Sequence, residues 1–414
     1  MRDALDRRGV FLASVAVLAG WMLQRPAITL LGTVVLFVAF LVWLWSRYAL
    51  VRIEHGRRFE IGRVFAGEET VLEIEVTNRK ILPLAWLRIE DRAPLKVTPR
   101  EQALAPSPMP GKGLLVHLLS MRWYERVRWR YTLDCPHRGI FQFGPARLTS
   151  GDVFGLRETA QELPRTTPLI VYPQVHPLDR LGLPTKEPFG DFSAEQWIYE
   201  DLSRPAGVRE YRVGDPLKRI HWKATARTAR LQSRAFEPTT APHLSLFLDV
   251  ATFTRHWEGL NPALLERTVV VAASVANFAA EAGYGVGLLA NCSWPMSDRP
   301  VSVAPGRAPT QMRRVLEALA AVSSLPSHPI DRLLSVEAGR IFWGATLVVV
   351  TPVVATGLIE EMAGLRRRGR RMCLITLDPN PVEGDLEGIT VHSVAEEAVG
   401  EAMAEGGVGW ANSL

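Results

Sequence analysis

The stretch 208–237 gathers charged and hydrogen-bonding side chains at short spacing. They are Arg209, Glu210, Asp215, Lys218, Arg219, His221, Lys223 and Arg227. Carboxylates and a histidine can serve as general acids and bases. One hypothesis is therefore a hydrolase that uses Glu210 and His221 as bases. The chain has no G-x-S-x-G nucleophile motif, which weakens this hypothesis.

The same side chains also fit structural roles. Arg209, Glu210, Arg227 and Glu237 form the charges of an ion-pair network around a turn, and such networks perturb pKa values without catalysis. His221 has no second histidine four residues later, so we expect a packed or surface residue rather than a metal ligand.

Local signals predict how this stretch is built. Residues 207–213 suit a strand, and Gly214-Asp215-Pro216 suits a turn. Asp215 is the expected N-cap of a helix from about 217 to 228. Trp222 is expected on the buried side of that helix, as is Ala226. A second strand is expected to return over 231–237.

The N-terminal region predicts a transmembrane hairpin over residues 1–48. Apolar residues fill 9–23 and 27–45, separated only by Gln24-Arg25-Pro26. A helix needs about 20 apolar residues to cross the bilayer core, so the second segment suffices and the first is marginal. Arginines flank both outer ends, which places the soluble part in the cytoplasm at an inner or plasma membrane. The alternative is a signal peptide in the first segment.

The three cysteines are distant from one another and lack C-x-x-C spacing. They are Cys135, Cys292 and Cys373. This pattern favours neither a disulfide framework nor a zinc site, and we expect buried or incidental thiols. It agrees with a cytoplasmic location.

Residues 49–165 predict an all-β sandwich. Apolar and polar residues alternate over 70–77, and further strands are expected at 86–90, 113–119, 126–133 and 146–149. Several short antiparallel strands separated by turn residues are typical of a sandwich. Arg126, Arg128 and Arg130 are expected on one solvated strand face, with Trp129 facing the core.

Residues 241–414 predict an α/β domain with a mainly parallel sheet, after a connector at 166–240. Strands are expected at 243–250, 284–290, 345–351 and 372–377, and helices at 264–282, 311–322 and 358–367. No glycine-rich phosphate loop follows these strands, so no nucleotide cofactor is expected. The basic run 366–371 is expected to compensate a helix dipole, and the alternative is an electrostatic contact with anionic lipid or an acidic partner protein. No base-reading motif accompanies the basic charge, so nucleic acid is not an expected partner.

Three segments carry a resemblance to the bacterial family called domain of unknown function 58. They are the stretch 208–237, Arg138–Pro145 and Asp152–Leu156. The resemblance implies that a AAA+ ATPase of the MoxR type is a partner. The lipid bilayer is a further expected partner, and other membrane proteins are possible ones. The residues expected for the signature or for docking are Arg209, Glu210, Tyr211, Gly214, Asp215, Trp222, Arg227 and Glu237.

The C-terminal domain also resembles a von Willebrand factor type A domain. That family binds a metal through Asp-x-Ser-x-Ser, and here the loop reads Asp249-Val250-Ala251-Thr252-Phe253. Asp249 fits the first position, whereas Ala251 and Phe253 offer no oxygen ligand. Mg²⁺ requires near-octahedral oxygen coordination, so Asp249 is only a weak candidate ligand. The expected function is a non-enzymatic, anchored scaffold, and a hydrolase or a metal-dependent adhesion protein are the alternatives.

Overall fold

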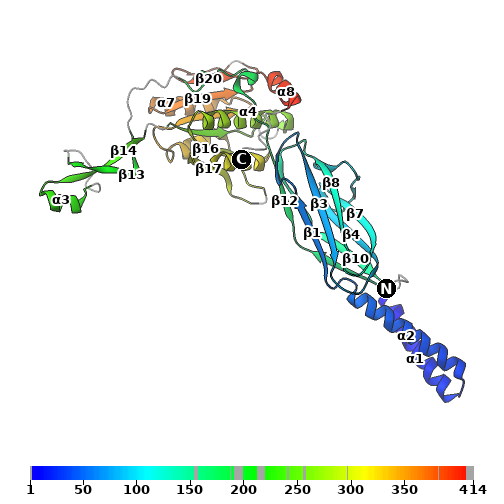
Figure 1. Cartoon of the computed structure of the whole chain (residues 1–414). Helices are drawn as coiled ribbons and strands as arrows, with labels where there is room; N and C mark the ends of the chain where they lie inside the picture. The colour runs from blue at the N-terminus through cyan, green and yellow to red at the C-terminus, as the bar shows by residue number, and fades with distance from the viewer. Residues whose placement is uncertain are drawn as a thin grey trace. The chain divides into compact units, whose positions relative to one another are not determined.

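The structure is a computed structural model, and the chain forms two compact units, Met1–Tyr172 and Pro173–Leu414 (Figure 1). The described residues are 2–152, 157–186, 188–190, 199–211, 220–239, 242–254, 258–295, 297–380 and 382–406.

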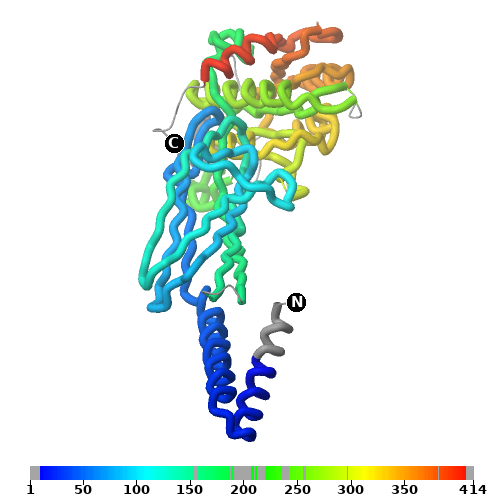
Figure 2. The backbone as a smooth tube through the Cα atoms, turned by 90° about the vertical axis from the view of Figure 1, so that its right-hand side faces the viewer, coloured from blue at the N-terminus to red at the C-terminus, as the bar shows by residue number. Residues whose placement is uncertain are grey.

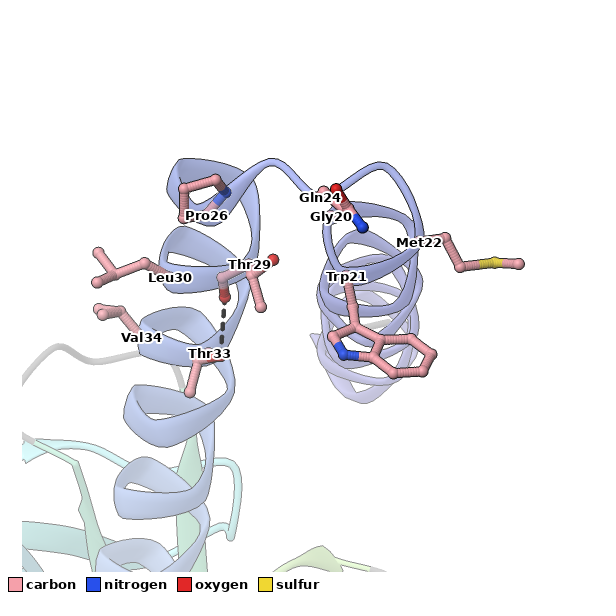
Figure 3. A pocket seen from close by; sticks show the side chains of 9 residues that line it. All are labelled: Gly20, Trp21, Met22, Gln24, Pro26, Thr29, Leu30, Thr33 and Val34. Carbon is pink, nitrogen blue, oxygen red and sulfur yellow. Dashed lines mark hydrogen bonds between the residues drawn. The ribbon is translucent and has the colours of Figure 1, made fainter.

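The first unit begins with two antiparallel helices, α1 (Arg2–Met22) and α2 (Pro26–Tyr48) (Figure 2). Glycines let them approach closely. A Cβ atom at Gly20 would lie 2.7 Å from the backbone nitrogen of Thr29, and one at Gly32 would lie 3.1 Å from the carbonyl oxygen of Ala13. Small residues at such contacts are typical of helix pairs in membranes. Figure 3 shows Gly20 and Thr29 where the two helices leave their loop.

Two described helices are long and apolar enough to cross a membrane. α2 has a mean hydropathy of 2.6 and is 11% buried over its most apolar window. The second, Pro262–Glu281, is 61% buried and is a core helix of the second unit. The apolar character of Pro262–Glu281 is therefore explained by its burial in the core of the second unit. The apolar side chains of α2, in contrast, are mostly exposed.

Three sheets follow α2. Their strand orders are β1-β3-β8-β5, β11-β10-β4-β7-β6 and β2-β12-β9. The strands are β1 (Ile53–Phe59), β2 (Arg63–Phe65), β3 (Glu69–Asn78), β4 (Leu84–Pro94), β5 (Thr98–Pro99), β6 (Ala105–Pro106), β7 (Lys112–Met121), β8 (Arg126–Asp134), β9 (Gly139–Phe143), β10 (Ala146–Gly151), β11 (Glu158–Leu163) and β12 (Thr167–Tyr172). All pairs are antiparallel except β2 with β12. The predicted strands of this region are present, and β12 extends the unit beyond the expected end at 165.

Apolar and polar residues alternate along the long strands, so the apolar side chains of each strand face a shared core. Ile74 and Val76 of β3 and Leu87 and Ile89 of β4 are fully buried. On the opposite face, Arg128 pairs with Glu75 at 2.6 Å. The expected solvated row of Arg126, Arg128 and Arg130 is confirmed, because all three are exposed and Trp129 packs on the core.

The second unit contains a six-stranded sheet in the order β17-β16-β15-β18-β19-β20. The strands are β15 (His243–Leu248), β16 (Gly285–Ser293), β17 (Pro300–Gly306), β18 (Thr346–Thr351), β19 (Arg371–Thr376) and β20 (Thr390–Ser393). β17 is antiparallel to β16, and the other pairs are parallel. This is the order of a doubly wound sheet, whose switch point lies between β15 and β18.

Helices cover both faces of this sheet. The helices are α4 (Pro262–Glu281), α5 (Gln311–Ala321), α6 (Ile330–Ala338), α7 (Thr356–Arg367) and α8 (Glu396–Glu405), and a short 3₁₀ turn, η1 (Leu178–Leu181), precedes them. α6 and α7 pack on Phe247, Val349 and Leu374. α4 lies beside α5 and α8. The alternation of apolar strands and helices predicted this arrangement, although α6, α8, β17 and β20 were not expected.

The three cysteines are buried free thiols, as expected. Burial raises the pKa of Cys135 to about 12, and it raises that of Cys373 to about 12 as well. Thiols held in the neutral form are poor nucleophiles.

Candidate functional site

The signature stretch folds as a β-hairpin that carries a short helix, and we call the segment Tyr199–Thr239 the arm. β13 (Tyr199–Glu210) pairs antiparallel with β14 (Gln232–Thr239). On the other side of β14, Ile220 forms a bridge with Ser233. The amide of His221 donates to the carbonyl of Gln232 at 2.8 Å. β14 is therefore held along both edges near this point.

The helix of the arm, α3, spans Trp222–Thr228. The helix was predicted to start near 217, but α3 starts at Trp222, because Ile220 just before it is held in a β-bridge. His221 is the N-cap, and its Nδ1 accepts a hydrogen bond from the amide of Ala224 at 3.1 Å. Gly214 and Asp215 themselves lie outside the described residues.

Polar side chains fix α3 to β14. The hydroxyl of Thr225 accepts from the amide of Gln232 at 3.0 Å. The hydroxyl of Thr228 donates to the carbonyl of Ala224 at 3.0 Å. Trp222 is 68% exposed, which corrects its expected burial, and Ala226 is exposed too. Trp222 can stay exposed because α3 is attached to β14 by the hydrogen bond between Thr225 and Gln232 rather than by apolar contacts.

The predicted ion-pair network is only partly described. Glu210 accepts from Arg230 at 3.1 Å, and both side chains are exposed. Arg230 was not among the predicted residues. Arg227 is exposed, and Tyr211 is half-buried. The side chains of Arg209 and Glu237 lie outside the described residues.

The arm does not bring Glu210 and His221 together. Glu210 pairs with Gln232 from one side of β14, and His221 bonds the same residue from the other side. Two strand spacings separate their backbones by about 10 Å. Nδ1 of His221 is also occupied by the cap. This geometry does not support a joint role as bases.

A second polar group lies at the switch point of the six-stranded sheet. Asp249 follows β15, and Thr351 ends β18. Oδ1 of Asp249 accepts from the amide of Ala251 at 3.0 Å and from Nδ2 of Asn291 at 2.8 Å. Oδ2 accepts from the hydroxyl of Thr351 at 2.9 Å. Burial raises the pKa of Asp249, and these three hydrogen bonds act in the opposite direction. Both carboxylate oxygens are thus engaged by protein donors.

Neighbouring polar residues at this sheet edge are also engaged. Oδ2 of Asp378, beyond β19, accepts from the amide of Val354 at 3.1 Å, and Oδ1 accepts from Asn380. Thr252 accepts from the amide of Asn261 at 2.9 Å. No group of three or more histidine, cysteine or acidic side chains that could hold a metal occurs among the described residues. The sequence pointed to Asp249 but gave no signal for Asn291, which lies distant along the chain.

The basic run after α7 serves mainly the fold. Arg370 is buried and donates to the carbonyls of Phe342 at 2.7 Å and Ile341 at 2.9 Å. Its guanidinium also lies 4.4 Å from the ring centroid of Trp343. Arg366 donates to the carbonyl of Gly388 at 2.7 Å. The run therefore does more than compensate the helix dipole.

A further polar cluster, not predicted from the sequence, lies inside the sandwich. Nε of Arg57 donates to Asp91 at 2.5 Å, and His55 lies 3.6 Å from the same oxygen. His117 bonds the hydroxyl of Tyr131 at 2.5 Å. Burial lowers the pKa of His55 to about 4, and it lowers that of His117 to about 4. Both imidazoles are therefore neutral at physiological pH.

Known proteins resemble the chain in the region of the arm and beyond it. A model of the family described as protein of unknown function DUF58 matches residues 207–372. A protein of Bacillus subtilis (strain 168), described as uncharacterized protein YeaD, is 23% identical over 381 residues, covering 90% of this chain and 89% of that protein.

Solved structures give only weak likenesses. A cohesin module from a Clostridium perfringens ATCC13124 family 33 glycoside hydrolase has a TM-score of 0.20 and 11% identity, over 29% of this chain and 96% of that one. A β-glucosidase from Listeria innocua has a TM-score of 0.18 and 12% identity, over 29% and 16%. Such low scores bear on neither fold nor function. The family model covers most of the arm and most of the sheet, and YeaD is similar along nearly the whole chain, so residues 207–372 of this protein match the DUF58 family of proteins of unknown function.

Proposed function

We propose that the chain is a membrane-anchored, non-enzymatic interaction protein that works with a AAA+ ATPase of the MoxR type in assembly or chaperone-like activity. The hairpin 1–48 is the proposed anchor in an inner or plasma membrane, with the soluble parts in the cytoplasm. The apolar, largely unburied surface of α2 supports this placement. The choice of ATPase comes from the family resemblance.

One observation supports the proposal: side chains of the signature hold α3 in place while Trp222 is exposed. His221 and Thr225 are used to fix α3, while Trp222 is left exposed. The described side chains of the arm carry four exposed cations and one acid. The cations are Lys223, Arg227, Arg230 and Arg234, and the acid is Glu210. Tryptophan and arginine on a rigid support are the residues that dominate protein interfaces. The partner's surface is therefore expected to have an apolar pocket for Trp222, surrounded by acidic residues that face the cations.

We also propose that the second unit is a von Willebrand factor type A-like domain used for binding. The strand order with a reversed β17 and the position of Asp249 at the switch point support this assignment. The engaged oxygens of Asp249 favour a binding module whose loop is held by internal hydrogen bonds.

Copurification tests the proposal. The full chain, extracted in mild detergent with nucleotide present, is expected to recover a MoxR-type ATPase. Trp222→Ala should lower recovery, whereas Leu325→Ala should not; Leu325 is a matched control because it is an exposed apolar residue of the second unit (75%) outside the arm. Recovery of no AAA+ ATPase under any nucleotide condition would count against the function. Equal recovery with Trp222→Ala would count against the arm as the contact.

A second candidate function is metal-dependent adhesion. The approach of Thr351 to Asp249 favours it, since both can offer oxygen to Mg²⁺. A metal would have to displace the donors that now hold Asp249. Thermal unfolding of the full chain with and without Mg²⁺ or Mn²⁺ tests this, and an unchanged midpoint would remove the candidate.

A further inference from the structure

The end of the sandwich next to α2 carries an exposed aromatic and basic face. We define the base as two turns, Arg79–Leu82 between β3 and β4 and Arg122–Glu125 between β7 and β8. Ile81 is 76% exposed, Trp123 63% and Tyr124 68%. A soluble domain rarely shows large apolar side chains together unless they meet a partner or a membrane.

Lys80 holds the base against the end of α2. Its ammonium, which is buried, donates to the carbonyls of Tyr48 at 2.8 Å and Val51 at 2.9 Å, and also to that of Ala49. The amide of Tyr124 donates to the carbonyl of Lys80 at 3.3 Å. The two turns and the last residues of the helix are thus joined by hydrogen bonds.

Further contacts make this junction stiff. Nδ2 of Asn78 donates to the carbonyls of Leu82 at 3.0 Å and Arg122 at 2.8 Å, which joins the two turns directly. The hydroxyl of Thr159 donates to the carbonyl of Ser46 at 3.2 Å. Ala49 and Leu50, directly after α2, belong to the sandwich core. Figure 1 shows α2 running into this end of the sandwich.

The position of the base follows from that of α2. If α2 crosses the bilayer, its last turn lies at the membrane surface, where tryptophan and tyrosine are enriched. The base is bonded to that turn, so it lies at the same level. Exposed cations surround it, and two acids lie among them. The cations are Arg47, Arg52, Arg79 and Arg122, and the acids are Glu54 and Glu125. Basic residues at the cytoplasmic leaflet are attracted to anionic lipids.

We propose that the base is a membrane-contacting face, in which Ile81, Trp123 and Tyr124 enter the headgroup layer and the arginines bind anionic lipid phosphates. The inference rests on the proposed anchoring by the hairpin. It makes the sandwich a rigid extension of the anchor that lies on the bilayer, rather than a domain on a flexible tether.

Depth-dependent fluorescence quenching in the full chain tests the inference. Single cysteines are introduced by Tyr124→Cys, Leu41→Cys and Met109→Cys and labelled with bimane in vesicles that contain brominated lipids. The native thiols are buried, so labelling is directed to the new sites. Met109 is the matched control because it is exposed and precedes the opposite end of β7, about 30 Å along the strand.

We expect strong quenching at position 41, and several-fold stronger quenching at 124 than at 109. Quenching at 41 with none at 124 overturns the inference and leaves the anchor intact. No quenching at 41 overturns the anchor and the inference together. Replacement of phosphatidylglycerol by phosphatidylcholine should reduce quenching at 124; an unchanged value would overturn the role of the arginines. Ile81→Ser should reduce the signal at 124 if the apolar side chains insert, and an unchanged signal would overturn that insertion.

Discussion

Replacement of Lys80 by methionine probes the junction between α2 and the sandwich. Methionine keeps an unbranched chain but removes three hydrogen bonds to backbone carbonyls. Tyr48 and Val51 are exposed, so water can replace the donor at their carbonyls in part. Ala49 is fully buried, and its carbonyl would lose a partner that water cannot supply. A buried unsatisfied group costs about 1–3 kcal/mol, so Lys80→Met should reduce the free energy of unfolding by about that amount.

The effect should depend on pH in a defined window. Burial lowers the pKa of Lys80 from 10.5 to about 8. Between these values the unfolded chain binds more protons than the folded chain, so the contribution of Lys80 to stability rises with pH. The methionine variant lacks this rise, and its deficit relative to the native chain should widen as pH increases through the window.

Urea denaturation of the full chain in detergent, followed by tryptophan fluorescence, measures both quantities. Lys96→Met is the control, because Lys96 is an exposed lysine of the same sandwich. Trypsin cleavage at Arg52 gives a second readout, since a loosened junction exposes that bond. A stability of Lys80→Met equal to that of the control, with no change of the difference across the pH window, would refute the reasoning.

Three further predictions concern other parts of the chain. The folded pKa of about 4 for His55 and for His117 means that their contribution to stability is full above about pH 6.5 and is lost as pH falls toward 4; acid titration should show a shallower loss in His117→Gln, and an identical profile would contradict the assignment. Gly32→Ile should separate α1 from α2, because even a Cβ atom there meets Val17 and Ala13; a lowered thermal midpoint in detergent is expected, and Gly62→Ile, where nothing lies within 4 Å, serves as the control. Thr351→Val should destabilise the second unit by about 1–2 kcal/mol, since Oδ2 of buried Asp249 loses its donor; urea denaturation measures it, and Thr356→Val at the exposed start of α7 should have little effect.

Prediction from the sequence was most accurate where the signal is local and repeated. Alternation over Thr70–Thr77 identified β3, and the apolar run at 27–45 identified α2, because each pattern reports one face of one element. The short elements α6, β17, β20 and α8 give weak periodicity and were not expected. The segment Asp152–Leu156 carried part of the family resemblance, but residues 153–156 lie outside the described part of the chain.

The sequence alone indicated the longer strands and helices, the position of Asp249 at a strand end and the resemblance to the DUF58 family. Tertiary structure decided what the polar residues do. From the sequence, a lysine in the turn after β3 is expected to be solvated, but folding brings Lys80 to three carbonyls at the end of α2 and just after it. Asn291 reaches Asp249 only because β15 and β16 are neighbours in the sheet. Ile220 is bridged to Ser233, so α3 starts only at Trp222. Each outcome depends on contacts between distant residues, which local propensity does not encode.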